Sequence, residues 1–322
     1  MDLSPPTIDD VRQAWSLVRG LVLRTPLIES PDLSDRVGRR VLLKLETLQR
    51  TGSFKYRGAM TFLSMMTEEA RARGVVAYSS GNHAQAVAAA AAHFGVSAII
   101  VMPSDAPEMK ARRTREWGAE IVEYDRATDD RAAISAGIAH RTGAAIIPPY
   151  EHPWTIAGQG TTGLELAEQC RAVDVLDPVV LVPTGGGGLT AGIALALSAD
   201  LPDARVHTVE PVDFDDYARS LATGERVGIA QPTGSICDAL LAPMPGEISF
   251  AINRRLVAGA ETVTDDEVRV AIAYAFEDLK LVVEPGGSVG LALLLAGRAP
   301  GTGPCVAVLS GGNVDPVMLL SK

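Results

Sequence analysis

Cysteine, histidine and lysine are scarce in the 322-residue sequence, which contains three, five and five of them. The cysteines are widely spaced, so they match neither a disulfide framework nor a zinc pattern, and we interpret them as buried thiols. The histidines show none of the short spacings with which histidine pairs hold a metal ion. These shortages argue against a disulfide-stapled fold and against a histidine metal centre.

Long apolar runs and clusters of positive charge are also missing. The longest apolar stretches, such as residues 86–92 and 291–296, are far shorter than the roughly 20 residues that a membrane helix requires. A net charge of -10 without a basic cluster argues against nucleic acid and anionic membranes as partners. Residues 1–10 are acidic and lack the basic start and apolar core of a signal peptide. We expect a cytoplasmic protein whose partners are small molecules.

What remains is an ordinary globular composition, with 47% hydrophobic and 21% charged residues. Short β-branched runs alternate with longer alanine-rich stretches, which predicts an α/β protein with parallel sheets flanked by helices. Strands are expected at residues 41–45, 75–78, 98–101, 121–123, 144–147, 179–182, 206–209 and 305–309. Thr7 followed by Asp10 resembles a helix start, so a first helix is expected from there to residue 23. Further helices are expected at residues 85–94, 108–117, 131–141, 163–171, 189–198, 265–279 and 288–294.

Four consecutive glycines follow the predicted strand 179–182 and open a helix: Gly185, Gly186, Gly187 and Gly188. Their backbone N–H groups can close on an anion, and the helix dipole favours negative charge there, so the loop is predicted to bind phosphate. A merely tight turn would need only one or two glycines. Gly186, Gly188 and Ala191 also satisfy a dinucleotide fingerprint, and Glu210 stands where a ribose-binding acid would. An NAD site is therefore the alternative at this point.

Lys55 lies between Phe54 and Tyr56, in a loop rich in glycine and serine that follows the predicted strand 41–45. A lysine that attacks a carbonyl must be neutral, and partial desolvation by aromatic neighbours lowers its pKa toward that state. From this segment alone, an exposed lysine on a turn explains the residues equally well.

Two further loops of small residues follow predicted strands. Residues 79–85, Ser-Ser-Gly-Asn-His-Ala-Gln, open a helix and form an anion-binding nest that suits a carboxylate. An N-cap that serves only the helix is the simpler alternative, but a single serine would provide it. Residues 310–313, Ser-Gly-Gly-Asn, are weak evidence alone, because glycine turns after strands are common.

Taken together and in this order, the segments resemble the fold type II pyridoxal 5′-phosphate (PLP) enzymes, in the branch of threonine/serine dehydratases and serine racemases. The similarity runs over most of the chain, so an NAD-dependent dehydrogenase becomes a distant alternative. The matching segments are residues 53–59, 79–85, 156–161, 185–188, 284–285 and 310–313.

The resemblance implies a tryptophan synthase β-like fold with open parallel sheets in two domains. Residues 1–48 and 147–322 would form a large PLP-binding domain, and residues 49–146 a small mobile one. A homodimer is also implied. The segment Cys237-Asp238-Ala239 and Thr184 depart from the family pattern near the cofactor, which puts the shape of the pocket in doubt.

For the cofactor, the resemblance implies that Lys55 forms the Schiff base and acts as the base at the substrate α-carbon. The remaining cofactor contacts would come from Phe54 at the ring, Asn82 at the 3′-oxygen, Gly185, Gly186, Gly187 and Gly188 at the phosphate, and Ser310 at the pyridine nitrogen. A neutral serine does not hold that nitrogen protonated, which favours elimination over long-lived carbanion chemistry.

For the substrate, the resemblance implies a small amino acid held by Ser79, Ser80, Asn82 and His83. Ser80 also matches the residue that, in racemising members, acts at the face of the substrate α-carbon opposite the lysine. The implied activity is L-threonine/L-serine dehydration to a 2-oxo acid and ammonia.

Serine racemase and 3-hydroxyaspartate dehydratase are the alternatives within the family, the second because Arg131 matches an arginine that in the racemases can reach a substrate carboxylate. An exposed arginine on a helix is the simpler interpretation of Arg131. Cysteine synthases rank lower, since their loop lacks the histidine and glutamine at residues 83 and 85. A non-catalytic ligand-binding relative is a further alternative.

A magnesium or manganese site is implied at Glu210, the Phe214 carbonyl and Asp216. Hard oxygen ligands suit such ions. The alternative is a set of solvated acids at a helix start, where the dipole favours them anyway.

Overall fold

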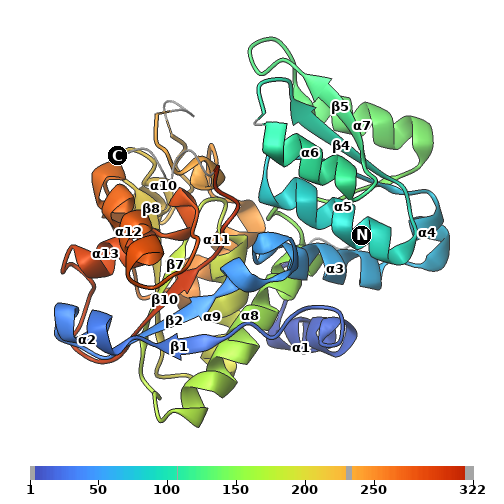
Figure 1. Cartoon of the computed structure of the whole chain (residues 1–322). Helices are drawn as coiled ribbons and strands as arrows, with labels where there is room; N and C mark the ends of the chain where they lie inside the picture. The colour runs from blue at the N-terminus through green and yellow to red at the C-terminus, as the bar shows by residue number, and fades with distance from the viewer. Residues whose placement is uncertain (1–3, 107, 230–233, 316–322) are drawn as a thin grey trace.

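The computed structural model describes residues 4–106, 108–229 and 234–315, so the outermost residues of the predicted domain segments 1–48 and 147–322 lie outside it. The predicted α/β architecture is confirmed. Two separate sheets are each flanked by helices, the larger toward the lower left of Figure 1 and the smaller toward the upper right.

The larger sheet contains strands from both ends of the chain. Its order is β1-β2-β10-β7-β8-β9, in which β1 is antiparallel to β2 and the other neighbours are parallel. The C-terminal strand β10 is inserted between β2 and β7, and β7 and β10 are buried along their whole length, as expected for strands covered on both faces. The strands are β1 (Leu27–Glu29), β2 (Val41–Leu45), β7 (Val179–Pro183), β8 (Arg205–Pro211), β9 (Gly259–Val263) and β10 (Cys305–Leu309).

The smaller sheet is entirely parallel, with the order β5-β4-β3-β6. All its strands fall within residues 49–146, while the bounds and mobility of the predicted small domain stay predictions. The strands are β3 (Val75–Tyr78), β4 (Ala98–Pro103), β5 (Glu120–Tyr124) and β6 (Ala145–Ile146).

Helices cover both sheets (Figure 1). Their bounds are α1 (Ile8–Val18), α2 (Pro31–Val37), α3 (Lys55–Met65), α4 (Glu68–Ala72), α5 (Asn82–Phe94), α6 (Glu108–Glu116), α7 (Arg131–Thr142), α8 (Pro153–Ala172), α9 (Gly188–Asp200), α10 (Asp216–Thr223), α11 (Glu247–Leu256), α12 (Asp265–Glu277) and α13 (Val289–Leu295).

Helix α8 begins ten residues before its predicted start at residue 163. The helix contains Gly158, Gly160 and Gly163, which lower helix propensity and weaken the helical pattern in the sequence. The structure shows why they are there: a Cβ at Gly158 would crowd the backbone of α3, and one at Gly163 would crowd α9. The glycines therefore permit close packing of α8 against both neighbours.

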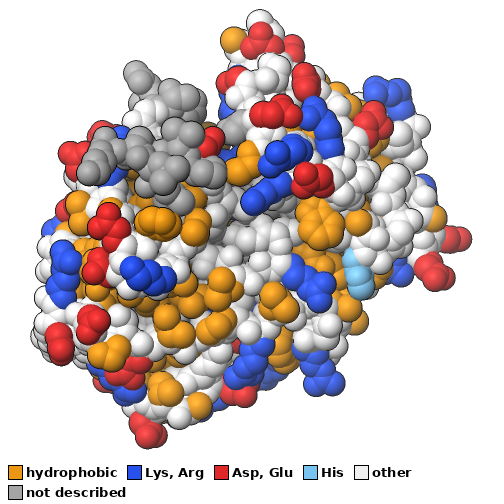
Figure 2. All heavy atoms as spheres, viewed as in Figure 1, with side chains coloured by type: hydrophobic (Ala, Val, Ile, Leu, Met, Phe, Trp, Pro, Cys, Tyr) orange, Lys and Arg blue, Asp and Glu red, His pale blue; other side chains and the backbone are white. Residues whose placement is uncertain are grey.

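The surface carries mixed charge. On the face drawn in Figure 2, Lys and Arg side chains are interspersed with Asp and Glu. Within the described part of the chain, no helix combines the length and the apolar character needed to cross a membrane.

Candidate active site

One pocket lies at the carboxyl ends of β3, β7 and β10, where the loops of both sheets meet. It brings together the predicted cofactor and substrate residues from segments far apart in the sequence. The pocket is lined by Phe54, Lys55, Ser79, Ser80, Asn82, His83, the four glycines of residues 185–188 and Ser310. Open parallel sheets bind ligands at this edge.

Lys55 is the first residue of α3, and its amine faces the pocket. Nζ donates to the Pro149 carbonyl oxygen at 2.7 Å and lies 5.1 Å from the centroid of the Phe54 ring. Burial lowers the pKa of Lys55 to about 8, against the opposing effect of the Glu284 carboxylate. An amine with this pKa is partly neutral near neutral pH, which is the form that attacks a carbonyl or accepts a proton.

The glycine loop forms a cradle that side chains would fill. Gly187 has φ +90°, and a Cβ there would collide with the Tyr217 hydroxyl, which lies outside the pocket lining, so the back of the loop has no room for a side chain either. A Cβ at Gly186 would collide with the Tyr150 ring. Among the described residues, the amide N–H groups at positions 185–188 have no acceptor. Unpaired amides at the start of α9 are the donor set that a phosphate group requires, so the loop fits the phosphate of PLP.

Thr184, the departure before this loop, is buried with its hydroxyl satisfied. Oγ1 donates to the Val182 carbonyl at 2.8 Å and lies 2.7 Å from Thr190 Oγ1. It therefore adds no unpaired polar atom to the cofactor site.

Asn82 is held between two other polar side chains. Its Nδ2 donates to Glu284 Oε1, and its Oδ1 accepts from Asn313 Nδ2 at 2.7 Å. Burial raises the pKa of Glu284 to about 7, so this carboxyl group is partly protonated near neutral pH. The sequence placed Glu284 and Asn313 in matching segments but gave neither a role.

The neighbouring loop places Ser79, Ser80 and His83 on the pocket wall. Ser79 Oγ accepts from the Gly81 amide at 3.1 Å. Burial lowers the pKa of His83 to about 3, and its Nε2 lies 2.8 Å from the Ile147 carbonyl oxygen. The ring is therefore neutral and donates through Nε2, which leaves Nδ1 as an acceptor.

Ser310 closes the pocket at the end of β10. Its backbone carbonyl accepts from the Phe54 amide at 3.1 Å, and Ser53 pairs with Gly311 in an antiparallel bridge. These backbone contacts bind the lysine loop to the serine loop, so the two predicted cofactor contacts are fixed relative to each other.

The pocket also contains Tyr150 and Lys110, to which the sequence gave no role, and Arg131, which the resemblance linked to a second substrate carboxylate. Tyr150 stacks beside the glycines, and Lys110 on α6 forms an ion pair with Asp238 at 2.8 Å. Arg131 lies 5.4 Å from the Tyr78 ring centroid and has no carboxylate partner within the described residues. Only tertiary structure brings these residues to the pocket, and no motif marks Tyr150 or Lys110.

The predicted metal ligands lie outside the pocket lining, at the end of β8. Both oxygens of Glu210 accept backbone N–H groups, from Tyr217 at 2.9 Å and Ala218 at 3.0 Å. Both Asp216 oxygens are buried without a partner, and burial raises the Asp216 pKa to about 7. Burial and then Asp216 raise the pKa of Glu210.

The fit of this acidic pair to a metal is partial. The unpartnered Asp216 oxygens suit a hard cation, and Phe214 is buried beside them in sequence. However, no group of three or more His, Cys, Asp or Glu side chains gathers around a metal position in the described residues. The metal site stays a prediction.

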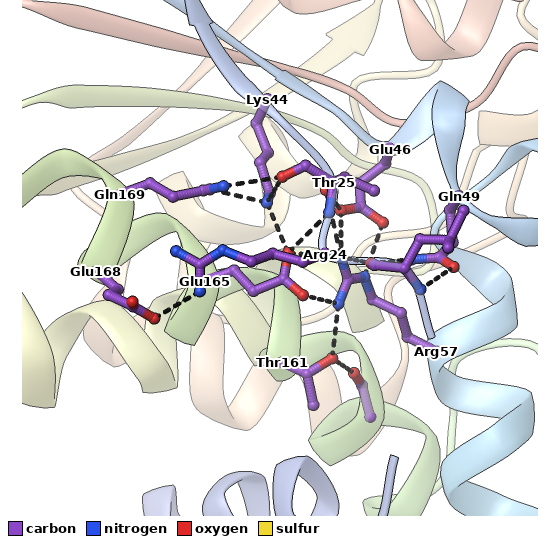
Figure 3. A network of polar contacts seen from close by, with 12 residues as sticks. Arg24, Thr25, Lys44, Glu46, Gln49, Arg57, Thr161, Glu165, Glu168 and Gln169 are labelled. Carbon is purple, nitrogen blue, oxygen red and sulfur yellow. Dashed lines mark hydrogen bonds and ion pairs between the residues drawn. The ribbon is translucent and has the colours of Figure 1, made fainter. Parts of the chain in front are cut away.

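A buried ion cluster lies behind the lysine loop (Figure 3). Arg57 pairs with Glu46 through Nε and with Glu165 through Nη1, both at 2.8 Å. Lys44 Nζ pairs with the second Glu165 oxygen at 2.8 Å. All four side chains are at most 1% exposed. The cluster joins β2, α8 and the first turn of α3. Its member in α3, Arg57, is two residues from Lys55.

Comparison with known proteins agrees with this geometry. A family model described as pyridoxal-phosphate dependent enzyme matches residues 18–311. L-threo-3-hydroxyaspartate ammonia-lyase of Saccharomyces cerevisiae is 42% identical over 96% of this chain and 94% of its own length. L-threonine ammonia-lyase of Thermotoga maritima is 39% identical over 97% of this chain and 77% of its own. The structure of maize serine racemase has a TM-score of 0.92 at 35% identity, covering 98% of this chain and 96% of that one.

The buried cluster predicts a large difference between two neighbouring glutamates of α8. Glu165→Gln leaves two buried cations with one carboxylate, so we expect the free energy of unfolding in urea to fall by about 3 to 5 kcal/mol. The matched control is Glu168→Gln, whose pair with Arg24 is 64% and 47% exposed, and which should cost at most about 1 kcal/mol. Equal losses in the two variants would contradict the stabilising role of the cluster.

Proposed function

The chain belongs to the family of pyridoxal-phosphate dependent enzymes, and from this premise we propose that it is an ammonia-lyase acting on small 3-hydroxy amino acids. The proposal rests on one pocket that contains the Lys55 amine, whose pKa is lowered, together with two loops. One is the loop of residues 185–188, whose amide N–H groups have no acceptor among the described residues, and the other is the loop of residues 79–83. Both curated relatives described above are named ammonia-lyases, which supports an elimination that releases ammonia.

The bound cofactor supplies a carbonyl that takes up the substrate amine and a conjugated ring that withdraws electrons from its α-carbon. The amides of residues 185–188 bind the phosphate, Asn82 contacts the 3′-oxygen, and Ser310 contacts the pyridine nitrogen. Because Ser310 is neutral, it does not hold a proton on that nitrogen. This arrangement favours rapid departure of the β-hydroxyl over accumulation of charge at the α-carbon.

Lys55 removes the proton from the α-carbon and holds it on Nζ. Ser79 and the amides of its loop grip the substrate carboxylate at the start of α5, where the helix dipole favours an anion. The proton on Nζ passes to the departing β-hydroxyl, which leaves as water, so the Lys55 amine is restored. A water molecule then hydrolyses the released unsaturated amine to a 2-oxo acid and ammonia. Ser80 lies on the same wall of the pocket. It acts at the face of the substrate α-carbon opposite Lys55, which gives the enzyme a racemase side activity.

L-threonine and L-serine are the proposed substrates. A specific observation favours 3-hydroxyaspartate as the second candidate: the Arg131 guanidinium lines the same pocket, and none of the described carboxylates pairs with it. A second substrate carboxylate would satisfy this charge. We also propose that the protein is a homodimer and that Glu210, Phe214 and Asp216 bind magnesium or manganese.

Lys55→Ala should abolish the visible absorption band of the purified, PLP-saturated protein and its ammonia release, because the covalent attachment and the base are lost together. Lys280→Ala is the matched control, since Lys280 is exposed and only donates to the Glu277 carbonyl. A colourless wild-type protein that binds NAD would overturn the PLP assignment.

Arg131→Gln should separate the substrates. We expect kcat/KM for 3-hydroxyaspartate to fall about 10- to 100-fold, the loss of one charge-assisted hydrogen bond, with values for L-serine and L-threonine changed less than about threefold. Arg126→Gln, in an exposed pair with Asp105, serves as the control. If wild-type protein releases ammonia from none of the three, the dehydratase proposal fails. If Arg131→Gln affects all three equally, Arg131 does not contact a second carboxylate.

Magnesium or manganese should raise the thermal midpoint, because a cation that binds only the folded state at 100 times its Kd stabilises it by about 2.7 kcal/mol. Asp216→Asn should remove the shift, and Asp215→Asn, which removes the half-buried partner of Arg219, should keep it. An unchanged midpoint with both ions would end the proposal of a metal site.

A further inference from the structure

Three polar side chains lie behind the glycine loop, on the side away from the pocket. Tyr217 comes from α10, and Ser249 and Asn253 come from α11. All three are 0% exposed, and none lines the pocket. The proposed reaction gives them no part, so their burial and their common position call for a separate explanation.

All three bond to carbonyl oxygens of the loop. The Gly186 oxygen accepts from Ser249 Oγ at 2.6 Å and lies 3.3 Å from Tyr217 Oη. The Gly187 oxygen accepts from Asn253 Nδ2 at 3.1 Å. Asn253 Nδ2 also donates to Tyr217 Oη at 3.2 Å, and Tyr217 Oη lies 3.0 Å from Ser249 Oγ.

The available hydrogens match these contacts. The two hydrogens of the Asn253 amide go to Gly187 and Tyr217, and the Ser249 hydrogen goes to Gly186 over the shortest distance. The Tyr217 hydrogen is then shared between Ser249 and Gly186. The trio is thus a connected chain of donors that ends on two successive carbonyl oxygens.

The same oxygens also accept backbone N–H groups, Gly186 from Gly246 at 3.1 Å and Gly187 from Ala191 at 2.9 Å, and the trio adds to these backbone contacts in fixing the orientation of the loop amides. In a planar trans peptide the C=O and the following N–H point in opposite directions. Drawing the Gly186 and Gly187 oxygens to the back therefore turns the Gly187 and Gly188 N–H groups away from the trio. Neither N–H group has an acceptor among the described residues, so both are free to bind an anion.

We propose that Tyr217, Ser249 and Asn253 are positioning residues that set the affinity for the cofactor's phosphate group by orienting the Gly187 and Gly188 amides. The inference rests on the proposed PLP chemistry. It adds residues that touch neither the cofactor nor the substrate. Because they act on the phosphate alone, they should discriminate between PLP and pyridoxal, which lacks the phosphate.

The test compares the Kd of PLP and of pyridoxal, measured by the visible absorption change on titrating apoprotein. Tyr217→Phe and Ser249→Ala should each raise the Kd of PLP by about tenfold, the loss of one hydrogen bond to the loop, and their combination should raise it further. The Kd of pyridoxal should stay within about twofold in the same variants. The phosphorus resonance of bound PLP should shift in each variant.

Tyr274→Phe and Ser198→Ala are the matched controls, since Tyr274 packs under Arg36 and Ser198 bonds only within α9. Both should leave both dissociation constants unchanged. Unchanged PLP affinity in folded Tyr217→Phe and Ser249→Ala proteins would overturn the inference, and so would an equal weakening of PLP and pyridoxal. Failure of wild-type protein to bind either compound would instead overturn the proposed function.

Discussion

The cofactor pocket depends on the buried cluster formed by Arg57, Glu46, Glu165 and Lys44. Burial alone would raise the pKa of Glu46, but Arg57, Lys44 and the Thr25 hydroxyl together outweigh it and leave that pKa below its ordinary value. The cluster is electrically balanced, with two cations and two carboxylates, so removal of any one member strands a buried charge. Since Arg57 lies in the first turn of α3, this balance fixes the helix that begins at Lys55.

The same design recurs at the phosphate loop. Polar groups in front of each loop face the pocket, and a hydrogen-bonded polar cluster behind the loop orients them. Arg57 and its partners lie behind the lysine, and Tyr217 with its two partners lies behind the glycines. The backbone contact between Phe54 and Ser310 then joins the lysine loop to β10. Rigid supports of this kind keep reacting groups within the narrow geometry that catalysis requires.

Much of the fold was predictable because its signals are local. Apolar β-branched runs identified β2, β3, β7 and β10 nearly to the residue, and three loops of small residues marked where the pocket would form. The sequence missed β1 and β9, which are short or polar at the sheet edges. It also missed α3, whose start at Lys55 follows a glycine-rich loop and has no side-chain cap.

The parts of the site that escaped prediction are those created by tertiary contact. Nothing near Tyr150 or Lys110 in the sequence signals a ligand, since each reaches the pocket only when the two sheets come together. The raised pKa of Glu284 follows from burial, which a motif does not reveal. The dinucleotide fingerprint in the glycine loop shows the converse: this local pattern fits two cofactors, and only the other segments of the chain, taken together and in order, favoured PLP over NAD.

The central claim is that Lys55 carries the cofactor, and reduction with sodium borohydride followed by peptide mass spectrometry tests it most directly. Borohydride fixes the link between a lysine amine and the cofactor aldehyde, so the labelled peptide identifies the lysine. We expect the pyridoxyl mass on the tryptic peptide of residues 51–57, the one that contains Lys55. A label on a peptide containing any of the other four lysines, or no label on protein saturated with PLP, would contradict it.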